Sequence, residues 1–110
     1  MDTAPVDSVI FYWRPGCGFC AALRRRLRRA GLAVVEVNIW QDRTAAAVVR
    51  SVARGNETVP TVVVGRQALV NPTVGDVLEA VRNEAPHLLP DPTPQLAVRH
   101  WPFWWRVKAR

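Results

Sequence analysis

The alternation of apolar and polar positions divides the first forty residues into a strand, a helix and a second strand. Residues 9–13 form a short apolar run of β-branched and aromatic side chains, which predicts a buried strand. After a break at residues 14–16, apolar positions recur every three or four residues over 17–30, and arginines occupy the opposite face, as in an amphipathic helix. The valine-rich run at 33–39 predicts the second strand.

The pattern that follows predicts a helix, two strands and a last helix. An aspartate in a capping position begins a helix over 42–54, and a glycine follows it. Two short apolar runs at 61–64 and 67–70 are separated by a two-residue turn, which predicts a hairpin. The last helix, 73–84, begins with a threonine and an aspartate at the spacing of a capping box.

The order β-α-β-α-β-β-α predicts an α/β fold in which three helices flank a four-stranded mixed sheet. A strand–helix–strand unit implies a right-handed crossover and therefore a parallel pair of strands. The closing hairpin adds an antiparallel pair. A chain of 110 residues has room for one such domain, which we place at residues 1–85.

The composition changes after Ala85, and residues 86–110 form a C-terminal extension rich in Pro, Trp and Arg. Four prolines between residues 86 and 94 predict a stiff, non-helical linker. The tail at 96–110 then mixes tryptophans with basic residues, as interfacial membrane segments do. We expect it to pack onto the domain, and we rank docking to a membrane or protein second and disorder third.

Charge and hydropathy exclude several classes of function. The chain has 15 Lys and Arg against 9 Asp and Glu, a net charge of +6. The arginines at 24–29 cover the outer face of an amphipathic helix, which favours a solvated face over a nucleic-acid site. No apolar stretch approaches the roughly 20 residues that span a bilayer, and residues 1–3 lack the features of a signal peptide. We expect a cytoplasmic monomer with no nucleic-acid or membrane partner.

The two cysteines, Cys17 and Cys20, lie three positions apart at the start of a predicted helix. A thiol placed there faces unpaired N–H groups that stabilise the thiolate, which is the attacking species in thiol–disulfide exchange. Cys20 falls on the apolar face and should be less exposed. Zinc sites usually need four ligands, and neither His87 nor His100 has zinc-finger spacing. A redox pair is therefore favoured over a metal site shared between two chains and over inert thiols.

A second candidate element is Thr58-Val59-Pro60-Thr61, where a proline leads into a strand. The simplest interpretation is that Pro60 marks the edge of the strand that it leads into. A cis Val59–Pro60 bond would instead present the Val59 backbone to a molecule docked at Cys17, although cis is the minority state for such bonds.

Three further residues near the cysteines, Arg14, Phe19 and Trp13, could take part in the chemistry. Arg14 could hold a thiolate or an anionic ligand, although an exposed loop arginine is slightly favoured. Phe19, between the cysteines, either contacts substrate or closes the start of the helix, and Trp13 or Phe19 could provide an apolar wall. Trp40 follows a strand and precedes a capping residue, and we predict that it packs beneath a loop.

In order and spacing, Cys17-Gly18-Phe19-Cys20, the segment 58–61 and Asn71-Pro72-Thr73 resemble the glutaredoxin-like branch of the thioredoxin superfamily. More narrowly, they resemble the mycoredoxins, which reduce mixed disulfides between proteins and mycothiol. The resemblance covers about residues 8–85 and implies a thioredoxin fold with a cis Pro60. It also implies that Cys17 is the nucleophile and that Cys20 resolves it in a dithiol cycle. The residues expected to contact substrate are Arg14, Phe19, Thr58, Val59, Pro60 and Asn71.

The resemblance also implies a set of partners. The clients are S-mycothiolated or disulfide-bonded proteins, and a separate NADPH-dependent reductase recycles mycothiol. No cofactor is bound, and the chain has no dinucleotide fingerprint. Glutaredoxins that use glutathione usually carry a Gly-Gly turn where this chain has Asn71-Pro72. Since Pro72 lacks a backbone donor, mycothiol is favoured over glutathione as the low-molecular-weight thiol.

Two alternative functions remain open. One is a redoxin reduced directly by thioredoxin reductase, but such proteins usually carry a tryptophan motif before the last helix, and residues 66–76 contain no tryptophan. The other is a binding protein that holds a [2Fe–2S] cluster between two chains, each giving Cys17 and an external thiol.

Overall fold

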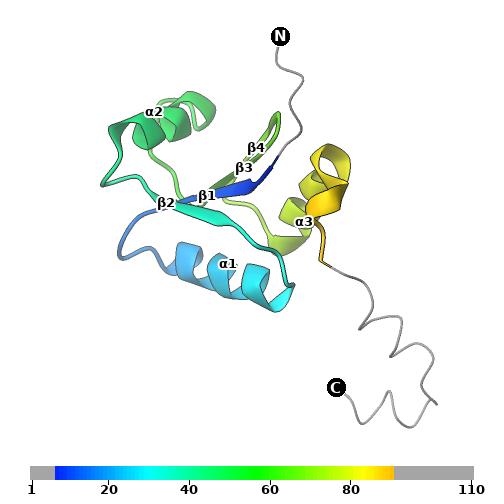
Figure 1. The fold of residues 1–110 in the computed structure, drawn as a ribbon. Helices are drawn as coiled ribbons and strands as arrows, with labels where there is room; N and C mark the ends of the chain where they lie inside the picture. Colours follow the sequence, from blue (N-terminus) through cyan, green and yellow to red (C-terminus); the bar gives the residue numbers. More distant parts are fainter. Residues whose placement is uncertain (1–6, 91–110) are drawn as a thin grey trace, which may run out of the picture.

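The computed structural model describes residues 7–90, and within them the predicted elements occur in the predicted order (Figure 1). The elements are β1 (Val9–Trp13), α1 (Gly18–Arg29), β2 (Val35–Asn38), α2 (Arg43–Val52), β3 (Thr61–Val64), β4 (Gln67–Val70), α3 (Val74–Glu84) and a short 3-10 helix, η1 (Pro86–Leu88). The α/β prediction is therefore confirmed.

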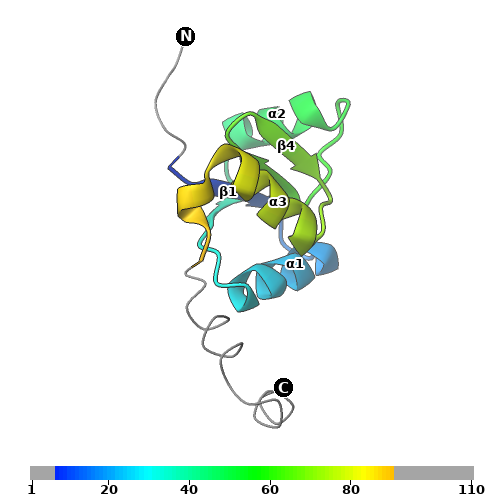
Figure 2. The same cartoon turned by 90° about the vertical axis from the view of Figure 1, so that its right-hand side faces the viewer.

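The four strands form one mixed sheet in the order β2-β1-β3-β4. β1 pairs in parallel with β2, and it pairs with β3 in the antiparallel direction, as β3 does with β4. Side chains alternate across β1: Val9 and Phe11 face one layer, and Tyr12 faces the other. Helices α1 and α3 cover the first face and α2 covers the second (Figures 1 and 2).

Each of the three α-helices follows a residue whose side chain accepts a backbone hydrogen bond. Asp42 accepts from the Ala45 N–H, and Thr73 and Asp76 form the predicted capping box. Helix α1 begins after Cys17, whose sulfur accepts from the Cys20 N–H. It ends in arginines and carries no acidic residue, so its cations lie where the helix dipole favours them.

Four loops lie together at one end of the strands, and we call this end of the sheet the loop edge. The chain leaves β1, β2 and β4 at this edge and enters β3 there, because Tyr12 pairs with Thr61 and Thr61 pairs with Val70. The loop edge therefore consists of residues 14–17, 39–42, 58–60 and 71–73. The residues of the two candidate motifs, 17–20 and 58–61, all belong to the loop edge, to the first turn of α1 or to the start of β3.

The linker after residue 85 was predicted to be non-helical, and this prediction is wrong for its first residues. Residues 86–88 form the 3-10 helix η1, in which the Leu88 N–H bonds to the Ala85 carbonyl. Pro86 suits its first position because the ring fixes φ near the helical value. Leu88 and Leu89 then pack against the core cluster under α1 and α3. The predictions for residues 91–110 lie outside the described residues.

Within residues 7–90, no helix is both long enough and apolar enough to cross a membrane.

Candidate active site

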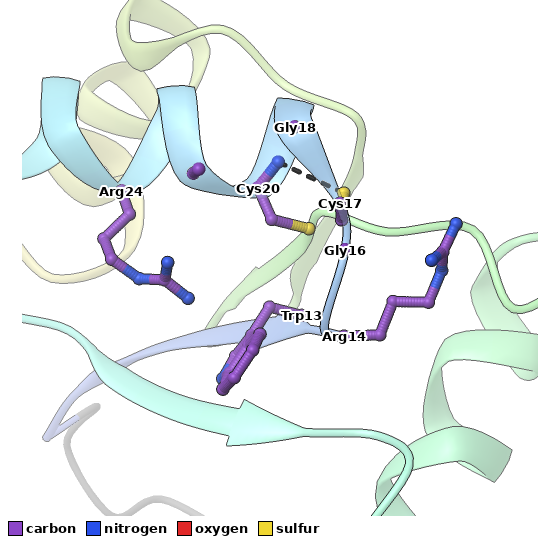
Figure 3. Close-up of a pocket in the computed structure, with 8 residues that line it drawn as sticks. Trp13, Arg14, Gly16, Cys17, Gly18, Cys20 and Arg24 are labelled. Carbon is purple, nitrogen blue, oxygen red and sulfur yellow. Dashed lines mark hydrogen bonds between the residues drawn. The ribbon is translucent and has the colours of Figure 1, made fainter.

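Cys17 lies at the loop edge as the N-terminal cap of α1. Its backbone is extended (φ −98°, ψ 106°), and its half-buried sulfur accepts a hydrogen bond from the Cys20 N–H at 3.2 Å (Figure 3). A sulfur in this position meets the positive end of the helix dipole, which favours a negative charge. Both cysteines are free thiols in the structure.

Cys20 lies in the first turn of α1 and is almost completely buried, with 1% of its surface exposed. Burial raises the pKa of the Cys20 thiol to about 12, and the Cys17 side chain acts in the same direction, against weaker opposing effects of the Arg14 backbone and the Arg24 guanidinium. At neutral pH Cys20 is therefore protonated. The predicted difference in exposure between the two thiols is confirmed.

The cis Val59–Pro60 bond lies beside the Cys17 thiol. The Cys17 thiol makes a long contact with the Val59 carbonyl, 3.8 Å from sulfur to oxygen. The Thr61 hydroxyl donates to the Thr58 carbonyl at 2.8 Å, and the Asn71 N–H donates to the Pro60 carbonyl at 2.8 Å. These bonds fix the backbone beside Cys17, and they bring the 58–60 and 71–73 loops together.

Thr58, Val59, Pro60 and Asn71 therefore meet at the loop edge, but mainly through their backbones. Pro60 is fully buried, whereas the Asn71 side chain is exposed. Asn71 adopts a positive φ of 51°, a conformation that asparagine tolerates better than most residues.

A cavity of about 360 Å³ opens beside the two thiols. One wall is the Trp13 ring, and the Arg24 guanidinium lies over that ring at 4.8 Å from its centre. Arg24 is also paired with Glu36, 2.9 Å from Nε to the carboxylate. The lining residues are Trp13, Arg14, Gly16, Cys17, Gly18, Cys20, Ala21 and Arg24 (Figure 3). Arg24 was not predicted, because sequence alone assigned it to the outer face of the helix.

Arg14 and Arg24 extend to opposite sides of the thiols (Figure 3). Arg14 lines the cavity, and its guanidinium lies over the Trp40 ring, 5.7 Å from the ring centre. Arg14 is half-buried, and so less exposed than the slightly favoured interpretation had it, and its role in the chemistry stays a prediction.

Phe19 and Trp40 are the two most exposed large apolar side chains of the described residues, at 73% and 63%. Phe19 thus projects from the first turn of α1 instead of closing it. The prediction that Trp40 packs beneath a loop is wrong. The neighbouring Ile39 fills the core position instead, and the Trp40 N–H bonds to the Asn38 side chain at 2.9 Å, which turns the chain outward. Parallel pairing of the first two strands could have placed Trp40 beside Arg14.

The part of the chain that the structure describes has no group of side chains suited to bind a metal ion. Among residues 7–90, no three His, Cys, Asp or Glu side chains lie close enough together to hold a metal ion.

The sequence is similar to known proteins over most of the folded domain. A glutaredoxin family model matches residues 9–69. A protein of Mycobacterium tuberculosis strain H37Rv that carries the glutaredoxin name, Rv3198A, is 38% identical over 71 residues, which are 64% of this chain and 84% of the relative. Its counterpart in strain CDC 1551, MT3292, matches equally well.

Solved structures give the fold independently. The glutaredoxin of Archaeoglobus fulgidus superposes with a TM-score of 0.55 at 23% identity, covering 68% of this chain and 86% of its own. A glutaredoxin of Brucella melitensis superposes with a TM-score of 0.51 at 25% identity, covering 76% and 87%. A mutant of the thioredoxin-like protein BC3987 gives a TM-score of 0.58 at 18% identity, covering 66% and 97%.

Proposed function

The chain belongs to the glutaredoxin family and is a thiol–disulfide oxidoreductase, and from this premise we propose that it reduces mixed disulfides between proteins and mycothiol. The observation that carries the proposal is the unequal burial of the two thiols, with Cys17 at the loop edge and Cys20 sealed beneath it. We further propose a cytoplasmic monomer whose mycothiol is recycled by a separate NADPH-dependent reductase.

In the first step, the Cys17 thiolate attacks the mycothiol sulfur of the mixed disulfide. The bond between that sulfur and the client sulfur breaks, and the client leaves as a thiolate that takes a proton from water. Cys17 is then joined to mycothiol by a new disulfide. The Cys20 N–H, 3.2 Å from the Cys17 sulfur, stabilises the attacking charge. The Val59 carbonyl marks the side on which the disulfide docks.

In the second step, a further mycothiol thiolate attacks the mycothiol sulfur held on Cys17. This releases oxidised mycothiol and restores the Cys17 thiolate, so the net result is reduction of the client mixed disulfide by one free mycothiol, with both mycothiol units leaving as the oxidised dimer. Attack by Cys20 would instead require its proton to leave a buried site where the pKa is about 12. We therefore propose that turnover runs chiefly through Cys17 alone.

The turn before α3 favours mycothiol over a thiol held by its carboxylates. The Asn71 N–H is already bonded to the Pro60 carbonyl, and the Thr73 N–H is bonded to the Asp76 carboxylate. Pro72, between them, has no N–H to donate. Three consecutive residues thus offer no free backbone N–H to a carboxylate. Mycothiol does not need one, because it carries an amide and sugar hydroxyls in place of a carboxylate.

The test is NADPH-coupled reduction of one model peptide in S-mycothiolated and S-glutathionylated form, each with its own recycling reductase. We expect faster turnover in the mycothiol assay, a loss to background in Cys17→Ser, and at least half of the rate retained in Cys20→Ser. Equal losses in the two variants would show an obligatory dithiol cycle. Activity only when thioredoxin reductase is supplied would contradict the mycothiol assignment.

A further inference from the structure

Trp40 is an exposed aromatic residue at the loop edge that the mechanism above does not use. It lies in the loop between β2 and α2, and 63% of its surface is exposed. Its backbone is fixed by the bond from its N–H to the Asn38 side chain. A large ring held on a fixed turn, at the same end of the sheet as Cys17, loses little conformational entropy when it binds a ligand.

Arg14 connects this ring to the thiol. Arg14 lines the cavity beside Cys17, and its guanidinium lies over Trp40 at 5.7 Å from the ring centre. One of its donors bonds to the Pro15 carbonyl at 3.3 Å. None of the ion pairs formed by residues 7–90 involves Arg14, so most of its donors remain available to a ligand.

The Arg24 side of the cavity has a different character. Its guanidinium is already paired with Glu36 at 2.9 Å and stacks on the rings of Trp13 and Phe11. Because its charge is compensated and its faces are covered, it has less to offer a ligand. Of the two sides of the thiols, the Arg14 side is the one with an unused cation and an exposed ring.

We propose that Trp40 and Arg14 form a subsite for the sugar portion of the low-molecular-weight thiol that becomes attached to Cys17. The apolar C–H face of a sugar ring stacks on the Trp40 indole, while Arg14 donates hydrogen bonds to its hydroxyl oxygens. This inference rests on the proposed function, since it names where that co-substrate lies. A carboxylate would need only the guanidinium, whereas a sugar uses both the ring and the cation.

The experiment compares Trp40→Ala and Trp40→Phe with the wild type in the two peptide assays described above. Val52→Ala is the matched control, because Val52 is another exposed apolar residue and lies on α2, outside the loop edge. For each protein, the ratio of kcat/KM for the mycothiolated peptide to that for the glutathionylated peptide is determined. We expect Trp40→Ala to lower this ratio about five-fold, through KM, as the loss of one aromatic contact would. Trp40→Phe should restore most of it, and Val52→Ala should keep it.

Binding of S-methyl mycothiol, which cannot react, provides a second readout by calorimetry. Weaker binding to Trp40→Ala, with an unchanged thermal midpoint, supports the subsite. If the wild type turns over the mycothiolated peptide but Trp40→Ala leaves the ratio and the binding unchanged, the subsite is refuted while the proposed function stands. If the wild type prefers the glutathionylated peptide, the proposed function fails, and the sugar assignment fails with it.

Discussion

Two thiols only three residues apart have different chemistry because one lies outside the helix and the other inside it. Cys17 is the cap residue, with extended backbone and a half-buried sulfur that meets the helix N-terminus. Cys20 lies within the first turn and packs with Leu23 and Leu27 on the face that covers the sheet. Burial therefore distinguishes the two thiols without any difference in residue type.

The raised pKa of Cys20 gives a stability prediction under reducing conditions. Its pKa of about 12 in the folded protein exceeds that of an unfolded cysteine, about 8.5, so the folded state holds this proton more tightly. The stabilisation is fully present below the unfolded value and is lost as the pH rises toward the folded value. Between about pH 8.5 and about pH 10 we expect Cys20 to account for a loss of about 2 kcal/mol in the free energy of unfolding.

Urea denaturation of the reduced wild type and of Cys20→Ser across this pH range measures the effect. Tyr12, whose pKa is raised by burial and by Asp42, is present in both proteins and cancels in the comparison. The wild type should lose stability more steeply than Cys20→Ser. Parallel pH dependences would show that Cys20 is not held as a buried thiol.

At the scale of elements, the start of α3 links helix capping to the active site. The capping box of Thr73 and Asp76 fixes the first turn, and two residues earlier the Asn71 N–H bonds to the carbonyl of the cis-proline. The cap therefore stabilises both a helix and one side of the loop edge.

Thr73→Ala removes one of the two hydrogen bonds of this capping box, the one from the Asp76 N–H to the Thr73 hydroxyl. We expect the free energy of unfolding to fall by about 1 kcal/mol, as for other N-terminal cap threonines. Ser51→Ala is the matched control, because the Ser51 hydroxyl bonds only to a carbonyl within its own exposed helical turn. Chemical denaturation of both variants measures the difference, and equal stabilities would mean that the cap contributes nothing here.

The elements could be predicted because each has a local cause, but their ends depend on partners elsewhere. The predicted strand at 33–39 contracts to Val35–Asn38, since β1 offers pairing partners only from Ile10 to Trp13. The helix predicted to reach Arg54 ends at Val52, where the chain turns and Arg54 adopts a positive φ of 57°. The spacing of apolar residues and the conformational propensity of each residue do not determine where this strand or this helix ends.

At the scale of the whole molecule, the site depends on loops that are far apart in the sequence. The Cys17–Cys20 pair could be found from sequence because both residues lie on one short segment. The cis bond at Pro60 could be expected only from the family resemblance, since trans is the more stable isomer in isolated chains. The contact between Arg14 and Trp40 depends on the register of the parallel pair, in which Trp13 lies opposite Asn38, and the sequence predicted the pair without its register.

The extent of the domain can be tested by truncation. Residues 1–85 were predicted to form the domain, but Leu88 and Leu89 pack against the core through η1. A chain that ends after Ala85 should be less stable than one that ends after Pro90 by about 2 kcal/mol, because two partly buried leucines are lost. Thermal midpoints of the two truncated chains measure this, with turnover as a check on folding. Equal midpoints would support the boundary at residue 85.

The arginines of α1 also act beyond the surface of the molecule. This helix starts beside Cys17 and carries Arg25, Arg26, Arg28 and Arg29, with no acidic residue, in addition to Arg24, whose charge Glu36 compensates. Their field reaches about 10 Å at about 0.1 M salt, so an acidic client is attracted and oriented before it touches the protein. An uncharged thiol feels no such pull. Discrimination among clients thus begins as a difference in encounter rate that varies with ionic strength, before any sulfur is within reach of Cys17.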